Sequence, residues 1–266
     1  MLRTLFSARL AIRLLCWRHL TLLATSGICL LYSCIGQAKS LTLATSFSIP
    51  PYILRQSDSG VQLEIVREAL AQHGHEIENI IYASNKRVQR LLSLKLVDMI
   101  INAPPGIEKA FYSDNIIDYQ NVAITLKSAG IKLEHIDDLA RFRVVAFQNA
   151  RQFFGKKFAK MAEENKKYSE VINQVVQVDQ LYRGVADVAI SDKWIFLYYR
   201  KQLSHKMALQ QPLTFHPIFP DSARPAAFYQ EALRNDFNLG LEKLRSSGRY
   251  QELLESYSRR YGLDFK

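Results

Sequence analysis

The chain has 266 residues, of which 48% are hydrophobic, 11% aromatic and 23% charged, and its formal net charge is +10. An apolar fraction of this size excludes an intrinsically disordered chain, and the absence of repeats excludes collagen and a long coiled coil. The length is sufficient for one large domain or for two lobes that each have a hydrophobic core.

The first 38 residues have the composition of an export signal. This segment contains four arginines and no acidic residue, and its apolar run, 20–32, is too short to span a bilayer. The small residues Gly36 and Ala38 place a cleavage site after Ala38. We therefore predict a cleaved signal peptide and a periplasmic mature protein. Two alternatives stay open, namely an uncleaved membrane anchor and lipid attachment at Cys34 through an imperfect lipobox.

The mature protein predicted in this way lacks cysteine, because Cys16, Cys29 and Cys34 all precede the cleavage site. It needs no disulfide, which suits a periplasmic protein large enough to rely on its core. No second run of 18 apolar residues follows residue 40, so we expect the mature part to be soluble.

Hydrophobic periodicity predicts alternating strands and helices from residue 41 onwards. The first strand ends before Pro50 and Pro51, because proline has no backbone N–H to donate to a sheet. The expected elements are a strand at 41–47, a helix between Gly60 and Gly74, a strand at 77–82, a helix that begins near Val88 and a buried strand at 97–101. This order predicts a parallel sheet of the α/β class.

The same alternation recurs in the second half of the chain. The expected elements are a short helix at 136–140, a strand at 143–147, a helix at 152–164, a strand at 175–178, a helix that begins at 179–183, a buried strand at 185–190 and a helix at 194–201. Two such units in tandem predict two lobes rather than one long sheet. We expect the proline-bearing stretch 212–225 to be a crossover and 228–261 to be helical, with a break at 246–248.

Motifs for phosphate binding, for the serine hydrolase elbow and for zinc proteases do not occur. His73 and His75 have no cysteine and no acidic cluster nearby to complete a metal site. The lysines within 156–167 are interleaved with Glu163 and Glu164, which is typical of a solvated helix face. We therefore expect no metal, no cofactor, no catalytic residue and no nucleic-acid partner.

Several short stretches, taken in order, resemble one known family. They are Ile49-Pro50-Pro51-Tyr52, the helix 60–74, Asn85-Lys86-Arg87 with 91–101, Tyr112-Ser113-Asp114, the segment 184–192, and 247–250 with Tyr257. Together they resemble the family 3 periplasmic solute-binding proteins, the polar amino acid receptors of ABC transporters, over essentially all of residues 41–262.

The resemblance implies an α/β fold of the two-lobe, type II periplasmic-binding-protein kind. Each lobe would be a mostly parallel sheet flanked by helices, and two hinge crossovers would join the lobes. Lobe 1 would hold 39–122, lobe 2 would hold 123–221, and the C-terminal helices of 222–266 would return to lobe 1. Ligands of such sheets bind beyond the carboxyl ends of the strands, here between the lobes.

The chain departs from the family at the motif that binds the ligand carboxylate. Relatives carry Thr-Pro-Glu-Arg after the third strand, and the arginine binds the carboxylate with two hydrogen bonds. This chain has Pro104-Pro105-Gly106-Ile107 there. Our hypothesis is that Arg151, supplied from lobe 2, replaces the missing arginine.

Four further residues are candidates for ligand binding, and two of them have a structural alternative. Tyr52 would stack on the ligand or be a core aromatic, and Arg87, at a helix start, would hold an anion or form a surface ion pair. Asn102 follows the third strand and would offer its amide. The aspartate that matches Asp192 holds the ligand ammonium in relatives.

We thus predict a monomeric periplasmic binding protein that captures a small polar, amino-acid-like solute and delivers it to an ABC permease. One alternative is a ligand-sensing subunit for a separate membrane receptor. Another is an enzyme similar to cyclohexadienyl dehydratase, for which Asp192 is the obvious general acid.

Overall fold

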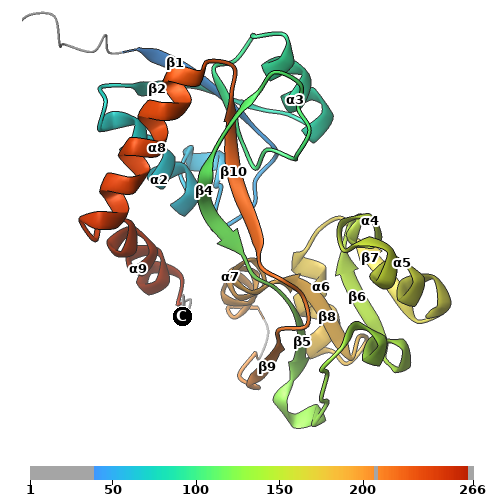
Figure 1. Cartoon of the computed structure of the whole chain (residues 1–266). Helices are drawn as coiled ribbons and strands as arrows, with labels where there is room; N and C mark the ends of the chain where they lie inside the picture. The colour runs from blue at the N-terminus through green and yellow to red at the C-terminus, as the bar shows by residue number, and fades with distance from the viewer. Residues whose placement is uncertain (1–38, 207–208, 263–266) are drawn as a thin grey trace, which may run out of the picture. The chain divides into compact units, whose positions relative to one another are not determined.

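The computed structural model of the chain describes residues 39–206 and 209–262 (Figure 1). The predicted signal peptide, its cleavage site and Cys34 lie outside the described residues. Within the described ranges, no helix is both long and apolar enough to cross a membrane.

Two five-stranded sheets form the framework, and their strand orders are β2-β1-β3-β10-β4 and β7-β6-β8-β5-β9. The strands are β1 (Ser40–Thr45), β2 (Glu76–Tyr82), β3 (Met99–Ile101), β4 (Phe111–Tyr119), β5 (Asn121–Leu126), β6 (Val144–Phe147), β7 (Tyr168–Val171), β8 (Val188–Asp192), β9 (Leu213–His216) and β10 (Ser222–Phe228). In each sheet three neighbouring strands run parallel, and the remaining two join them by antiparallel pairing.

Helices follow most of the parallel strands, as an α/β fold requires. The α-helices are α2 (Val61–Ala71), α3 (Asn85–Ser93), α4 (Ala150–Phe153), α5 (Gly155–Glu164), α6 (Val175–Tyr182), α7 (Lys193–Leu203), α8 (Glu231–Ser246) and α9 (Arg249–Tyr261). The described part of the chain also contains three short 3-10 helices, η2 (Arg55–Ser57), η3 (Lys127–Ala129) and η4 (Ile136–Arg141).

The chain passes between the two sheets twice. It leaves the first sheet at the end of β4 and enters the second with β5, and it returns from β9 to β10. Figure 1 shows β4 and β10 as adjacent long strands, and they pair antiparallel from Ser222↔Tyr119 to Phe228↔Phe111. Both connections between the sheets therefore lie in neighbouring strands.

Alternation of side chains along the short central strands gives each sheet two buried faces. In β3, Met99 and Ile101 belong to the core that contains α2 and α8, whereas Ile100 faces the core formed with α3. In the second sheet, Val144 and Ala146 pack against α5, while Val145 packs against α6. The near-continuous apolar runs of these strands reflect this burial on both sides.

Several sequence-based element predictions need correction, and strands β4 and β5 were not predicted from periodicity. Val175–Val178 was expected to be a strand but forms the first half of α6, because Val178 and Leu181 lie on one buried helical face. The strand that pairs with β6 is instead β7, which has little apolar character and was not predicted. The stretch 212–225, expected only as a crossover, also contains β9 and the start of β10.

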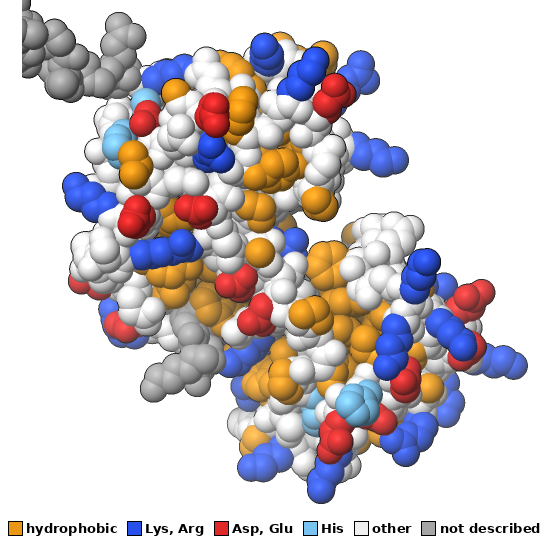
Figure 2. All heavy atoms as spheres, viewed as in Figure 1, with side chains coloured by type: hydrophobic (Ala, Val, Ile, Leu, Met, Phe, Trp, Pro, Cys, Tyr) orange, Lys and Arg blue, Asp and Glu red, His pale blue; other side chains and the backbone are white. Residues whose placement is uncertain are grey.

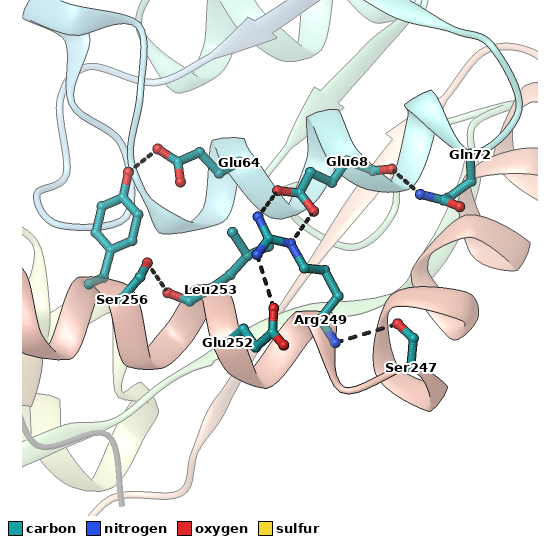
Figure 3. A network of polar contacts seen from close by, with 9 residues as sticks. Glu64, Glu68, Gln72, Ser247, Arg249, Glu252, Leu253 and Ser256 are labelled. Carbon is teal, nitrogen blue, oxygen red and sulfur yellow. Dashed lines mark hydrogen bonds and ion pairs between the residues drawn. The ribbon is translucent and has the colours of Figure 1, made fainter.

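Helices α8 and α9 return to pack on α2. At the α2–α8 contact a Cβ atom at Gly240 would lie 2.0 Å from the carbonyl oxygen of Ala69, so the close approach requires glycine. Figure 3 shows the α2–α9 contact, where the Arg249 guanidinium donates to both carboxylate oxygens of Glu68 at 2.7 and 2.8 Å and to Glu252 at 3.1 Å. Arg249 thereby ties the last helix to the first sheet's main helix.

Candidate functional site

A cavity of about 540 Å³ lies where the carboxyl ends of the parallel strands of both sheets meet. Its walls come from residues at or just after the ends of β1, β2, β3, β6, β7 and β8, from helices α4 and α7, and from the two connections between the sheets. The lining residues are Ser46, Phe47, Ser48, Ile49, Ser84, Asn85, Asn102, Tyr119, Asn121, Phe147, Gln148, Asn149, Phe153, Ile172, Gln174, Asp192, Ile195 and Arg224. Open α/β sheets bind their ligands at this edge.

Asp192, the last residue of β8, lines the cavity and is only 2% exposed. Its Oδ1 atom caps helix α7 by accepting hydrogen bonds from the backbone N–H groups of Trp194 at 2.9 Å and Ile195 at 3.0 Å. Burial raises the pKa of Asp192 to about 6, although these backbone donors and the Tyr52 hydroxyl favour the charged form and offset part of the burial effect. The cavity therefore contains a buried carboxylate that a cation would stabilise.

Tyr52 is fully buried and does not line the cavity, but it contacts Asp192 directly. Its hydroxyl lies 3.1 Å from each carboxylate oxygen of Asp192. The loop that carries Tyr52 is closed by two backbone hydrogen bonds between Ile49 and Ile53, each 2.9 Å long. Gly60 is required beneath this loop, since its φ is +122° and a Cβ atom there would lie 2.3 Å from the Tyr52 carbonyl oxygen. Tyr52 therefore contacts Asp192 from within the core and does not itself form part of the cavity wall.

Four flat groups stack in a row beside the cavity. The ring of Tyr52 stacks on Trp194 at 5.4 Å and on Tyr119 at 4.0 Å, measured between ring centroids. The guanidinium of Arg224 lies 4.3 Å from the centroid of the Tyr119 ring on the cavity side. Burial raises the pKa of both tyrosines, so both rings are neutral. The stack fixes the positions of the Arg224 cation and of the Tyr52 hydroxyl.

Asn102 lines the cavity at the end of β3, with a left-handed backbone conformation of φ 56°. Its Oδ1 atom accepts a hydrogen bond of 2.9 Å from Gln62, and its Nδ2 atom donates to the Tyr119 hydroxyl at 3.4 Å. Asn102 is therefore both a wall of the cavity and a support for the aromatic stack.

Arg87 and Arg151 lie outside this cavity. Arg87 is exposed on α3 and lines a separate surface hollow together with Lys86 and Arg90. Arg151 faces Glu170, with Nε 3.9 Å from the carboxylate, and its guanidinium lies over the Tyr168 ring at 5.2 Å. Of the five sequence-predicted residues, the structure brings Tyr52, Asn102 and Asp192 together and leaves the two arginines apart. Ligand binding by any of them stays a prediction.

Arg224 and Asn121 are two of the polar lining residues that the sequence did not indicate. Both lie in the connections between the sheets, Asn121 at the start of β5 and Arg224 in β10. Neither belongs to a motif, and a single arginine in a proline-bearing stretch carries no signal on its own. Their roles depend on the pairing of strands far apart in sequence.

The described residues contain no group of three or more His, Cys, Asp or Glu side chains placed to hold a metal ion. His73 and His75 both lie near Asp236, at 3.9 and 2.9 Å. On the face drawn in Figure 2, described Lys and Arg side chains are scattered and have Asp and Glu among them, without one continuous basic patch.

Comparisons with known proteins show similarity in fold. The glutamate-bound ligand-binding core of GluR0 matches with a TM-score of 0.65 and 14% identity, over 84% of this chain and 99% of that chain. A histidine kinase sensor domain with similarity to periplasmic binding proteins matches with a TM-score of 0.63 and 14% identity, over 83% and 96%. An ancestral cationic amino acid solute-binding protein matches with a TM-score of 0.62 and 17% identity, over 82% and 95%.

No protein-family model matches the chain, and no curated protein is similar enough in sequence to be matched. The structural matches nevertheless cover most of the chain and nearly all of each neighbour. The protein therefore has the two-lobe α/β fold of periplasmic binding proteins, as its sequence predicted, with two mixed sheets flanked by helices.

Proposed function

We propose that this is an exported solute-binding protein that holds a small polar, amino-acid-like solute in the cavity, with the ammonium group of the solute against Asp192. The observation that carries the proposal is the buried Asp192 carboxylate in the wall of that cavity. A buried charge is costly unless a partner of opposite sign compensates it, and a cationic group is that partner here.

The cavity suits a solute of this class. Its volume of about 540 Å³ is within the usual range for small-molecule sites. Apart from Asp192 and Arg224, its polar wall is made of serine, asparagine, glutamine and tyrosine side chains, which donate and accept hydrogen bonds without net charge. Phenylalanine and isoleucine side chains complete the lining, so the cavity offers a small solute both polar and apolar contacts.

The proposed assignment extends to the whole chain. Residues 1–38 would be the export signal, 39–122 and 222–266 would form one lobe, and 123–221 the other. The lobes would close on the solute by a hinge motion at the two connections between the sheets. The closed protein would act in the periplasm as a monomer and deliver its solute to an ABC permease, without chemical change of the solute.

A second candidate function is ligand sensing for a separate membrane receptor. The fold similarity to a histidine kinase sensor domain favours this candidate, since the same architecture serves signalling there. A comparison of solute uptake in cells with and without the gene separates the two functions. Uptake that is lost with the gene indicates transport, whereas unchanged uptake with a lost transcriptional response indicates sensing.

The direct test is a thermal-shift screen of the purified protein with amino acids, polyamines, small peptides and organic acids. A solute that binds the folded state alone raises the melting temperature by mass action. We expect an ammonium-bearing solute to bind to the wild type and to bind at least tenfold more weakly to Asp192→Asn, as measured by calorimetry. Binding that is unchanged in this variant contradicts the proposal, and conversion of the bound solute, detected by mass spectrometry, indicates an enzyme instead.

A further inference from the structure

The cavity wall contains two hydrogen-bond donors that have no partner. The Nε atom of Arg224 and the Nδ2 atom of Asn121 are buried and form no hydrogen bond with any described residue. Asn121 is only 5% exposed, and both residues line the cavity. Buried polar atoms in folded proteins are nearly always satisfied, so two unsatisfied donors on residues that line one cavity are exceptions that an acceptor on a bound solute would explain.

The local strand geometry turns Arg224 into the cavity. The pairing of β10 with β4 shifts register between Ala223 and Pro225, and the backbone N–H of Arg224 donates at 2.7 Å to the Asn115 side chain. Irregularities of this kind redirect a side chain from the regular alternation of a strand. The guanidinium then lies between the rings of Tyr119 at 4.3 Å and Phe153 at 5.4 Å, which hold it in place without using its N–H donors.

Within the described ranges, no carboxylate lies within ion-pair distance of Arg224; by contrast, Arg143, Arg183 and Arg249 each contact an aspartate or glutamate. Asn121 is the strand partner of Asp192 in the β5–β8 ladder. Asn121 therefore adjoins the proposed ammonium site, and Arg224 lines the same cavity. A carboxylate can accept two hydrogen bonds from an arginine guanidinium and a further one from a neighbouring amide N–H. A guanidinium beside an amide N–H therefore complements a carboxylate.

We infer that Arg224 and Asn121, at positions outside the family's carboxylate motif, form an anion subsite that binds the carboxylate of the solute. This inference rests on the proposed function and deepens it. The subsite lies on the two connections between the sheets, so solute binding would act directly on the segments about which the lobes move.

The test compares each amino acid that binds with its amide, which keeps the ammonium group and lacks the carboxylate. By calorimetry we expect the amide to bind at least tenfold more weakly to the wild type. Arg224→Gln should weaken binding of the acid at least tenfold and leave binding of the amide unchanged. Arg224→Lys should also weaken the acid, because lysine keeps the charge but loses the planar pair of donors.

Arg151→Gln is the matched control and also tests the sequence-based hypothesis for that residue. We expect it to bind the acid as the wild type does, because Arg151 lies outside the cavity. Asn121→Ala, which is expected to weaken binding of the acid severalfold, supplies a second variant if Arg224→Gln does not fold.

Equal binding of acid and amide, or an unchanged affinity in Arg224→Gln, overturns the anion subsite while the ammonium site at Asp192 stands. Loss in Arg224→Gln without loss in Asp192→Asn supports the subsite and overturns the ammonium site, and failure of every amino acid to bind overturns both.

Discussion

The hydroxyl of Tyr52 lies 3.1 Å from both carboxylate oxygens of Asp192, although the two residues are 140 positions apart in sequence. Tyr52 belongs to the loop after β1 of the first sheet, and Asp192 is the last residue of β8 in the second. One hydrogen bond therefore connects the two sheets at the wall of the cavity. The hydrogen bond also stabilises the buried Asp192 carboxylate, to which the proposed ligand would bind.

Tyr52→Phe should remove this hydrogen bond and keep the ring stack with Tyr119 and Trp194. Loss of a hydrogen bond to a charged group costs about 2 kcal/mol, which urea denaturation would detect as a lower midpoint. The variant should also have a higher pKa at Asp192, because the hydroxyl favours the carboxylate. Tyr229→Phe, whose hydroxyl lies 3.4 Å from Asp98, is the control and should change the midpoint less. Equal midpoints for wild type and Tyr52→Phe would contradict the prediction.

The affinity for an ammonium-bearing solute should depend on pH through Asp192. Its pKa is raised to about 6 in the unliganded protein, and the cation binds to the ionised form. Affinity should therefore be constant well above pH 6 and should fall by up to about tenfold per pH unit below it, as the proton must leave before the cation binds. Calorimetry between pH 4.5 and about 8 measures this profile. Glu108→Gln, an exposed carboxylate, should leave the profile unchanged, and a profile that is flat through pH 6 would show that Asp192 does not pair with the cation.

The stability of the unliganded protein should depend on pH in the opposite sense. The native pKa of Asp192 is about 6, and an unfolded aspartate has a pKa of about 3.9. Between these values the native state keeps a proton that the unfolded state releases, so the contribution of Asp192 to stability falls as pH rises from about 4 to 6. Asp192→Asn leaves every other titratable group unchanged and places asparagine, a good N-cap residue, at the start of α7. Its stability should therefore rise relative to that of the wild type as the pH increases from about 4 to 6. Urea midpoints at pH 4, 5, 6 and 7 for both proteins measure the difference, and parallel curves refute the assignment.

Gly240→Ala should destabilise the protein without affecting the site. The added Cβ atom would lie 2.0 Å from the backbone oxygen of Ala69, and neither helix can move without disturbing the core between α2 and α8. Overpacking of this kind costs about 1–3 kcal/mol. Leu239→Ala, at a neighbouring position that is 55% exposed, is the control and should change the unfolding midpoint little. A midpoint for Gly240→Ala equal to that of the control would contradict the close helix contact.

Predictions from the sequence succeeded where a pattern reflects local burial. The run 97–101 was expected to be a buried strand, and Met99–Ile101 is the central strand of the first sheet. Val175–Val178 is likewise rich in β-branched apolar residues yet starts a helix, because its burial follows the helical spacing of Val178 and Leu181. Strand β7 was not predicted, because this edge strand is held by its backbone pairing with β6 rather than by a pattern of apolar side chains.

The sequence by itself determined the α/β alternation, the two-lobe fold and the placement of Asp192 and Asn102 at strand ends, because these follow from hydrophobic period and from the order of elements. The tertiary structure decided which arginine faces the cavity. The sequence pointed to Arg151 and gave no signal for Arg224, but the side chain of Arg151 lies by Glu170, while an irregular pairing of β10 with β4 turns Arg224 toward Tyr119. Contacts of this kind join strands more than a hundred residues apart, and only the register of the assembled sheet specifies them.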